Sequence, residues 1–192
     1  MIKKINFPTF LTLLRLILSP CILPLALVYL LPYNFLWLNS LLTLFFVFLS
    51  LTDFFDGYLA RKYNWETKLG RALDPIADKF LVSSTLIALL AVKKINFIWV
   101  LIIIGREFFL MGLRQIALEN NFSISVSFWG KLKTSLQLIM LSFIILNPYQ
   151  DYGINFSWNI LELFLILLAI LISIYSAFQY YCEFKKSFIK VV

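Results

Sequence analysis

Long apolar runs separated by short polar breaks make up most of the chain, and this pattern predicts an all-α integral membrane protein. The runs "LTLLRLILSPCILPLALVYLL" and "LELFLILLAILISIYSAF" come close to the roughly 20 apolar residues that a helix needs to cross a bilayer. They lack the period-two alternation that marks the strands of a membrane barrel. We predict six transmembrane helices, over residues 9–31, 35–60, 74–92, 95–117, 128–147 and 156–181.

The composition agrees with a membrane protein. Of the 192 residues, 61% are hydrophobic and 14% are charged, whereas a soluble domain is about 45–50% apolar and about 25% charged. The linkers between the predicted spans are short, which predicts a single domain over residues 1–192. The first span is too long for a signal peptide, contains Arg15 and precedes no small-residue cleavage site, so we expect a mature helix.

Basic residues are distributed unevenly between the two sides of the predicted spans, and Lys and Arg concentrate on the cytoplasmic side of membrane proteins. One side carries Lys93 and Lys94. The other side carries eleven basic residues: Lys3, Lys4, Arg61, Lys62, Lys68, Arg71, Lys131, Lys133, Lys185, Lys186 and Lys190. We therefore expect both chain ends in the cytoplasm. The net charge of +7 suits an anionic lipid surface. Nucleic acid binding is the weaker interpretation, because the basic residues do not form a soluble module.

Two residue types limit the chemistry that the chain can perform. There is no histidine, so imidazole is excluded both as a metal ligand and as an acid or base. Cys21 and Cys182 fall inside apolar spans without the CxxC spacing of zinc sites. We interpret both cysteines as packing residues.

Four aspartates lie between two apolar runs, and Asp53 and Asp56 directly continue the apolar run "LLTLFFVFLSLT". These two are spaced i, i+3, and Asp74 and Asp78 are spaced i, i+4, so each pair shares one face of a helix. Two such helices packed as an antiparallel hairpin would bring the four carboxylates into one polar cavity near the cytoplasmic interface.

A cluster of four carboxylates at this depth predicts bound cations. One charge inside a bilayer costs roughly 2.5–3.5 kcal/mol, so four cost on the order of 10 kcal/mol before their repulsion is counted. Two divalent ions would neutralise them. Because every ligand is an oxygen, we expect two Mg²⁺ ions, with Mn²⁺ or Ca²⁺ as alternatives.

Small and basic residues accompany the aspartates. Gly57 and Ala60 continue the face of the first pair and leave room for a ligand, and Gly70 does the same or makes the turn. Arg61 and Lys68 could hold phosphate oxygens. Simpler interpretations stay open: Lys62, Lys68 and Arg71 as ordinary cytoplasmic charges, and Asp74 before Pro75 as a helix N-cap.

The same residues match a known pattern at every fixed position. The signature D-x2-D-G-x2-A-R-x8-G-x3-D-x3-D is that of the CDP-alcohol phosphatidyltransferase class-I family, which the chain therefore resembles. The stretches "NFPTFLTLLRLILSP" and "GREFFLMGLRQIALENNFSISVSFWGKLKT" are similar to the bacterial phosphatidylglycerophosphate synthases of that family. The resemblance covers nearly the whole chain, although the last span matches only as a hydrophobic helix. The signature residues are Asp53, Asp56, Gly57, Ala60, Arg61, Gly70, Asp74 and Asp78.

The resemblance implies an enzyme of the bacterial cytoplasmic (inner) membrane that works as a homodimer. Such an enzyme transfers a phosphatidyl group from CDP-diacylglycerol to sn-glycerol 3-phosphate and releases CMP. It further implies that Asp53, Asp56 and Asp74 bind the metal pair, and that Asp78 touches the second metal and takes the proton from the attacking hydroxyl.

The resemblance also implies how the nucleotide is held. Gly57, Arg61 and Thr67 correspond to positions that bind the CDP group. Near the start of the first span, Asn6 and Thr9 begin a polar stripe that continues with Thr12 and Arg15. The stripe could face CDP-diacylglycerol, although the threonines would serve helix packing equally well.

An acceptor that carries its own phosphate needs a cationic site at membrane depth. Arg106 and Arg114 are eight residues apart and so roughly on one side of the fourth span, and Lys131 and Lys133 open the fifth. We predict these four residues as the acceptor-phosphate site. The alternatives are a structural pair of Arg106 with Glu107 or another helix, and a cytoplasmic charge for Lys131.

Other functions fit parts of the sequence. The same chemistry could act on inositol phosphate, serine, choline or phosphatidylglycerol, although the basic residues favour a phosphorylated acceptor. A divalent-cation channel or carrier could use the aspartates as a pathway. Against this, no acidic ladder continues to the other side, where Asp151 and Glu162 are isolated. A purely structural membrane protein would leave the charges within the spans unexplained.

Overall fold

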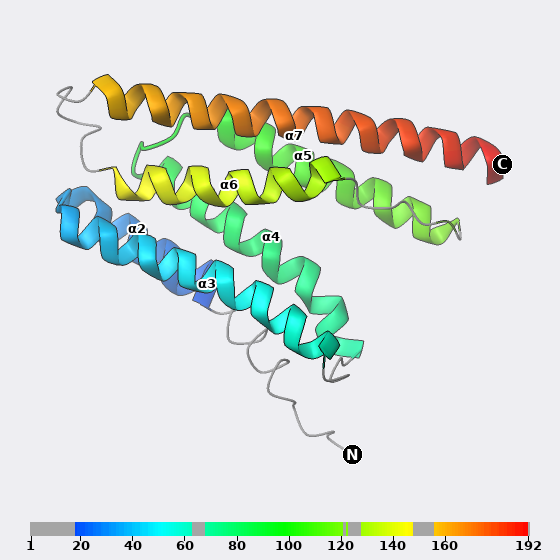
Figure 1. Ribbon diagram of the computed structural model, residues 1–192, viewed down its shortest axis with the longest axis horizontal. Helices are drawn as coiled ribbons and strands as arrows, with labels where there is room; N and C mark the ends of the chain where they lie inside the picture. The colour runs from blue at the N-terminus through cyan, green and yellow to red at the C-terminus, as the bar shows by residue number, and fades with distance from the viewer. Residues whose placement is uncertain (1–17, 63–67, 121, 123–127, 148–155, 192) are drawn as a thin grey trace, which may run out of the picture. The chain divides into compact units, whose positions relative to one another are not determined.

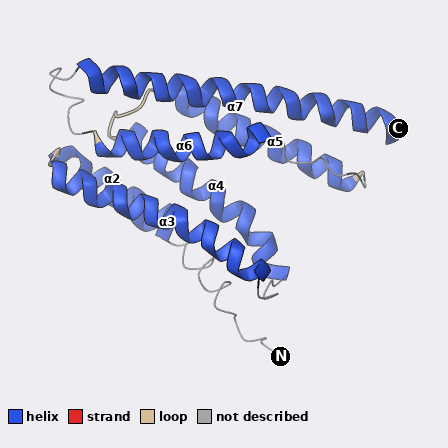
Figure 2. Ribbon diagram, viewed as in Figure 1, coloured by secondary structure: helices blue, strands red, loops and turns tan. Residues whose placement is uncertain are grey.

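The computed structural model describes side chains over residues 18–52, 79–120, 122, 128–147 and 158–189, and helix backbone alone over 53–62, 68–78, 156–157 and 190–191. Within these residues every regular element is a helix (Figure 2). The all-α prediction is thus confirmed for the described part. The elements are η1 (Leu18–Ile22), α2 (Leu23–Leu30), η2 (Leu31–Tyr33), α3 (Leu36–Lys62), α4 (Lys68–Ala91), α5 (Phe97–Glu119), α6 (Phe128–Leu146) and α7 (Phe156–Val191) (Figure 1).

Each predicted span overlaps one of the helices α2 to α7, with three differences in the bounds. The first predicted span, 9–31, is described only from Leu18, where η1, α2 and η2 follow one another in place of one continuous α-helix. Helix α4 begins at Lys68, six residues before the predicted start, so the interpretation of Asp74 as an N-cap is wrong. Pro75 therefore lies inside a helix, where it offers no N–H to the carbonyl of Arg71. Helix α7 continues to Val191, ten residues past the predicted end.

Two helical stretches are long and apolar enough to cross a membrane, Phe128–Leu146 and Trp158–Ile189. Shorter apolar helices cover Leu18–Tyr33, Leu36–Thr52 and Lys79–Ala91 among the described residues. Large apolar side chains are exposed along several helices, for example Phe48, Phe108 and Phe178, each more than 60% accessible. Exposed apolar surface of this extent indicates contact with lipid or another protein. The number of spans and the orientation stay predictions.

The chain divides into two compact units, residues 1–94 with 141–154, and residues 95–140 with 155–192. In the first unit, η1 and α2 pack against α4, and α2 also packs against α3. Leucines of α2 and α4 and an aromatic ring of α3 are completely buried there: Leu23, Leu27, Phe46, Leu86 and Leu89. Whether the whole chain is one domain stays a prediction.

A hydroxyl of α4 supports the irregular turn that starts this unit. Residues Leu18–Ile22 form a π-helix with bonds from i+5 to i. The residue five positions after Ser19 is Pro24, which has no N–H to donate. Ser84 Oγ instead donates to the buried carbonyl of Ser19 at 2.8 Å.

The turn that ends α4 has the hydrogen bonds of a Schellman motif. Lys94 N donates to Leu89 O at 2.9 Å and Lys93 N donates to Leu90 O at 3.0 Å. Lys93 adopts the left-handed conformation with φ of 59°, a position at which glycine is the usual residue. The buried Lys94 then donates its ammonium to the carbonyl of Asn147, directly after α6.

In the second unit, α5 and α7 pack side by side (Figure 1). Their contact includes Leu110 and Leu113 of α5 and Tyr180 of α7, flanked by Ala177 and Phe184. The side chain of Asn96 caps α5 by accepting a hydrogen bond from Ile98 N at 2.9 Å.

The first turn of α6 reaches α7 through Trp129 and Tyr175, whose ring centroids are 5.1 Å apart.

One face of α5 is exposed. Gly105 and Gly112 are exposed there, and a Cβ added at either would meet no atom within 4 Å.

Candidate functional site

The four signature aspartates lie on consecutive helices, as the sequence predicted. Asp53 and Asp56 belong to α3, and Asp74 and Asp78 belong to α4, so the i, i+3 and i, i+4 spacings place each pair on one helical face. Their side chains lie outside the described residues, as do those of Gly57, Ala60, Arg61 and Gly70. Asn6, Thr9 and Thr67 are also outside the described residues. Their predicted roles stay predictions.

The donor chemistry of this segment fits a hard metal ion. Carboxylate oxygens are the ligands that Mg²⁺ and Mn²⁺ prefer. Among the described side chains no three Asp, Glu, Cys or His residues are grouped closely enough to hold a metal. A metal site on the two aspartate helices stays a prediction.

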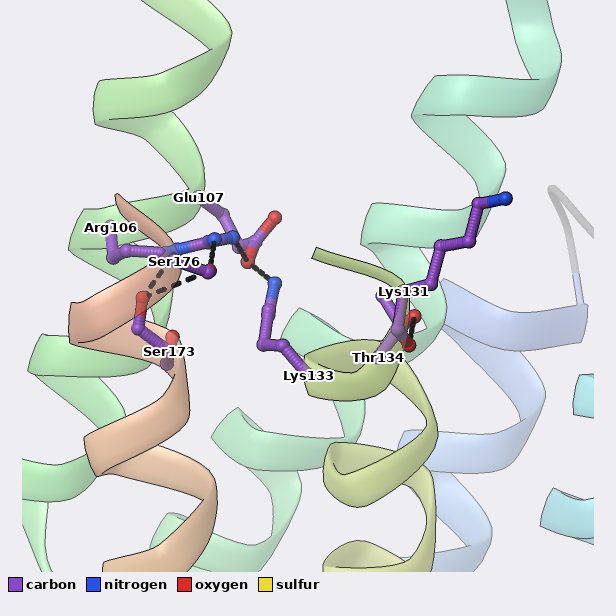
Figure 3. A network of polar contacts seen from close by, with 7 residues as sticks. All are labelled: Arg106, Glu107, Lys131, Lys133, Thr134, Ser173 and Ser176. Carbon is purple, nitrogen blue, oxygen red and sulfur yellow. Dashed lines mark hydrogen bonds and ion pairs between the residues drawn. The ribbon is translucent and has the colours of Figure 1, made fainter. Parts of the chain in front are cut away.

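A second polar site is described in full, and its centre is the carboxylate of Glu107 on α5 (Figure 3). Arg106 Nη1 donates to Glu107 Oε1 at 2.9 Å, and Lys133 Nζ on α6 pairs with the same oxygen. The three side chains are largely buried, with 11% of Arg106, 14% of Glu107 and 3% of Lys133 accessible. Two cations from different helices thus converge on one carboxylate oxygen.

Arg106 is also bound to α7 through two further hydrogen bonds. Its Nε donates to the carbonyl of Ser173 at 3.2 Å, and its Nη2 donates to Ser176 Oγ. The hydroxyl of Ser176 in turn donates to the carbonyl of Ser173 at 3.2 Å. Both serines are buried. The guanidinium is therefore held between α5 and α7 (Figure 3).

The structure separates the four predicted acceptor-phosphate residues into two groups. Arg106 and Lys133 meet at Glu107, so the alternative pairing of Arg106 with Glu107 is confirmed, and the role of the two cations in binding the acceptor phosphate stays a prediction. Arg114 is exposed, two turns further along α5, or about 12 Å. Lys131 is exposed, and its ammonium points away from Glu107 (Figure 3).

The same unit also contains buried polar side chains that carry no charge. Gln137 lies one turn after Lys133 on α6, is 1% exposed, and its Nε2 has no partner among the described residues. The hydroxyl of Ser173 is likewise buried without a described partner. Buried polar atoms without partners are rare in proteins.

Sequence reasoning considered Glu107 only as an alternative structural partner of Arg106, and it did not select Ser173 or Ser176. The acidic Glu107 beside Arg106 in an apolar span was a usable signal, since a buried charge is normally paired. The serines had only a weak signal, their i, i+3 spacing within the apolar α7.

In the described residues the chain is helical, exposes large apolar side chains and has two helices apolar enough to cross a membrane, which is typical of a membrane protein. Comparison with known proteins defines it further. The chain belongs to the CDP-alcohol phosphatidyltransferase family, whose family model matches residues 5–175.

Curated relatives are similar over most of the chain. The CDP-diacylglycerol–glycerol-3-phosphate 3-phosphatidyltransferase of Rickettsia typhi is 39% identical over 183 residues, which cover 95% of this chain and 99% of the relative. The protein of the same name from Yersinia enterocolitica is 34% identical, with 92% and 93% covered. That of Salmonella choleraesuis is 37% identical, with 76% and 79% covered.

Proposed function

We propose that this chain transfers a phosphatidyl group from CDP-diacylglycerol to sn-glycerol 3-phosphate, in the synthesis of phospholipid. The names of relatives that match nearly its full length support this reaction. The structural observation that carries the proposal is the convergence of Arg106 and Lys133 from two helices on one buried carboxylate. A buried cationic site is what an acceptor that brings its own phosphate requires.

The charge of this site suits a phosphate monoester. Arg106, Lys133 and Glu107 together carry a net charge of +1, and the exposed Arg114 adds a further positive charge about 12 Å along α5. A phosphate monoester carries about −1.5 to −2 at pH 7, so it would offset the positive charge of the site. Serine, choline or glycerol lacks this group and would leave one positive charge of the site uncompensated. Charge alone does not distinguish glycerol phosphate from inositol phosphate, and the names of the relatives favour the first.

The reaction exchanges one phosphorus–oxygen bond for another. The acceptor hydroxyl attacks the phosphorus that carries diacylglycerol, the bond from that phosphorus to the CMP oxygen breaks, and CMP leaves with the electron pair. We assign Asp78 to take the proton of the attacking hydroxyl. A positioned carboxylate can contribute in this way by general base catalysis.

Asp53, Asp56, Asp74 and Asp78 would hold two Mg²⁺ ions, or Mn²⁺ in their place. When bound, these ions would neutralise charge on the diphosphate and on the leaving CMP. Because α3 and α4 are consecutive helices, two neighbouring elements of the chain would supply all four carboxylates. Asp78 would serve both as ligand and as base.

The nucleotide half of CDP-diacylglycerol is assigned to the same hairpin. Gly57, Ala60 and Gly70 would let the substrate approach the helix backbone, and Arg61 would bind a phosphate oxygen. Thr67, with Asn6 and Thr9 from the first predicted span, would complete the binding of CDP. We place the enzyme in the bacterial cytoplasmic membrane as a homodimer with this site on the cytoplasmic side.

Measurement of CMP release from CDP-diacylglycerol by the purified protein tests the reaction. Glycerol 3-phosphate and glycerol form a matched pair of acceptors, since they differ only in the phosphate that the cationic site would bind. We expect Mg²⁺-dependent CMP release with the first and little with the second. CMP release with inositol phosphate but none with glycerol 3-phosphate would overturn the assignment of glycerol 3-phosphate as the acceptor. Flux of divalent cations through liposomes without substrates would support a channel instead.

A further inference from the structure

We propose that Ser176 of α7, together with the backbone carbonyl of Ser173, is a positioning site that orients the guanidinium of Arg106 for the acceptor phosphate. This inference rests on the proposed function of Arg106. It gives a specific role to the C-terminal helix α7, in which sequence reasoning selected no site residue. Ser176 would act through Arg106 and would not touch the substrate itself.

The hydrogen bonds fix the plane of the guanidinium. Nε donates to Ser173 O at 3.2 Å and Nη2 donates to Ser176 Oγ, so one edge of the group faces α7. Nη1 donates to Glu107 Oε1 at 2.9 Å on the other side. These contacts use three of the five N–H groups of an arginine. One N–H on Nη1 and one on Nη2 remain, and we assign these two groups to the acceptor phosphate.

The serine hydroxyl is itself held in place. Ser176 Oγ donates its proton to Ser173 O at 3.2 Å, so its lone pairs are directed away from that carbonyl and can accept from Arg106. Arg106 Nε and the Ser176 hydroxyl thus donate to the same carbonyl, which lies within the helical ladder of α7. Ser176 is only 2% exposed, which limits competition from water.

The packing of α5 against α7 sets the register of this contact. Leu110 and Leu113 follow Arg106 at i+4 and i+7, and Tyr180 follows Ser176 at i+4, so polar and apolar contacts lie on the same helix faces. The buried Leu110, Leu113 and Tyr180 form one cluster. A helix pair fixed by this cluster would hold Ser176 opposite Arg106 without the substrate.

A free arginine side chain samples many rotamers, and ordering it opposes ligand binding. Without the Ser176 hydroxyl, Arg106 would keep its contact with Glu107 but lose the bond that fixes the orientation of Nη2. We therefore expect weaker binding of the acceptor with little change in the chemical step. A hydrogen bond to a charged group is strong enough to change KM by roughly ten- to hundredfold.

The test compares three variants in the acceptor-dependent CMP release assay. Ser176→Ala removes the hydroxyl, Ser176→Thr keeps it, and Ser187→Ala makes the same change elsewhere on α7. We expect Ser176→Ala to raise KM for glycerol 3-phosphate about tenfold or more, with kcat and KM for CDP-diacylglycerol within about twofold of wild type. Ser176→Thr should restore most of the affinity, and Ser187→Ala should match wild type.

Two results would overturn the inference while leaving the proposed function intact. One is an unchanged KM for glycerol 3-phosphate in Ser176→Ala. The other is a parallel loss for both substrates with a lower unfolding temperature, which would show a purely structural role. If wild type releases no CMP with glycerol 3-phosphate, the proposed function fails instead. Calorimetric binding of inorganic phosphate to wild type and Ser176→Ala then still tests the positioning role, and equal affinities would refute it.

Discussion

Glu107 of α5 and Lys133 of α6 form an ion pair that joins two helices, and the oxygen that accepts from Lys133 also accepts from Arg106. The Lys133 side chain is almost completely buried, with 3% of it accessible to solvent. A carboxylate between two cations lowers their mutual repulsion while no ligand is bound. A phosphate that enters the site would take over part of this role.

Neutralising Glu107 should destabilise the protein. Glu107→Gln leaves Arg106 and the buried Lys133 without their shared anion, and removing one partner of a buried pair costs about 3–5 kcal/mol. We expect a clear fall in the thermal unfolding midpoint in detergent micelles. Combining it with Lys133→Met should recover part of the loss, because the unpaired ammonium is then absent. If the stability losses of Glu107→Gln and Lys133→Met simply add in the double variant, Glu107 and Lys133 are not energetically coupled.

Lys133 and Lys131 offer a matched pair of charge removals on one helix. Lys133→Met should raise KM for glycerol 3-phosphate by roughly ten- to hundredfold, since a buried charge-assisted contact would be lost. Lys131→Met should have a much smaller effect, because Lys131 is exposed and its ammonium points away from Glu107 (Figure 3). Equal effects of the two changes would show that the ligand does not bind beside Glu107.

Asp78→Asn should separate substrate binding from turnover. Loss of a general base typically lowers the rate by about 10²–10⁴-fold, so we expect CMP release to fall at least a hundredfold in steady-state assays at saturating Mg²⁺. Asp53→Asn serves as the comparison and should weaken Mg²⁺ activation itself. Near-wild-type kcat in Asp78→Asn would contradict the assignment of the base.

Removal of divalent metal should abolish the reaction reversibly. Chelation with EDTA should reduce CMP release to background, because the aspartates of α3 and α4 would then repel the diphosphate of the substrate. Added Mg²⁺ or Mn²⁺ should restore it. Full activity after exhaustive chelation would disprove the metal assignment.

The turn after α4 provides a test of stability far from any assigned role. Lys93 has φ of 59°, and the left-handed conformation costs a residue with a Cβ about 1 kcal/mol or more relative to glycine. Lys93→Gly should therefore raise the thermal unfolding midpoint, while Lys93→Ala, which keeps the Cβ, should not. A gain with alanine equal to that with glycine would point to the lysine charge as the cause.

The positions of the helices were largely predictable, because apolar runs and polar breaks mark them directly. The helix bounds differ from the predicted spans where composition changes without a helix ending. Lys185 and Lys186 looked like the end of the last span, yet no Gly or Pro follows, and α7 continues to Val191. Pro75 suggested a helix start at 74, but α4 accommodates it in its interior.

The candidate site was predictable only in part. Arg106 and Lys133 stood out as charges in or beside apolar runs, and the structure brings them together. Their common partner Glu107 and the contact of Arg106 with Ser176 depend on the rotation and relative height of α5, α6 and α7. Periodicity within one helix contains no information on the rotation of its neighbour, so these contacts required the fold.

The open glycines of α5 offer a means of observing what surrounds this enzyme. Spin labels on Gly105→Cys and Gly112→Cys, with Cys21 and Cys182 replaced by serine, would sit about 10 Å apart along one side of the helix and meet no neighbouring atom within 4 Å at their Cβ. Collisional relaxation by dissolved oxygen would then report whether acyl chains or a protein neighbour borders this surface. The same pair of probes would record any change when nucleotide-linked lipid is added.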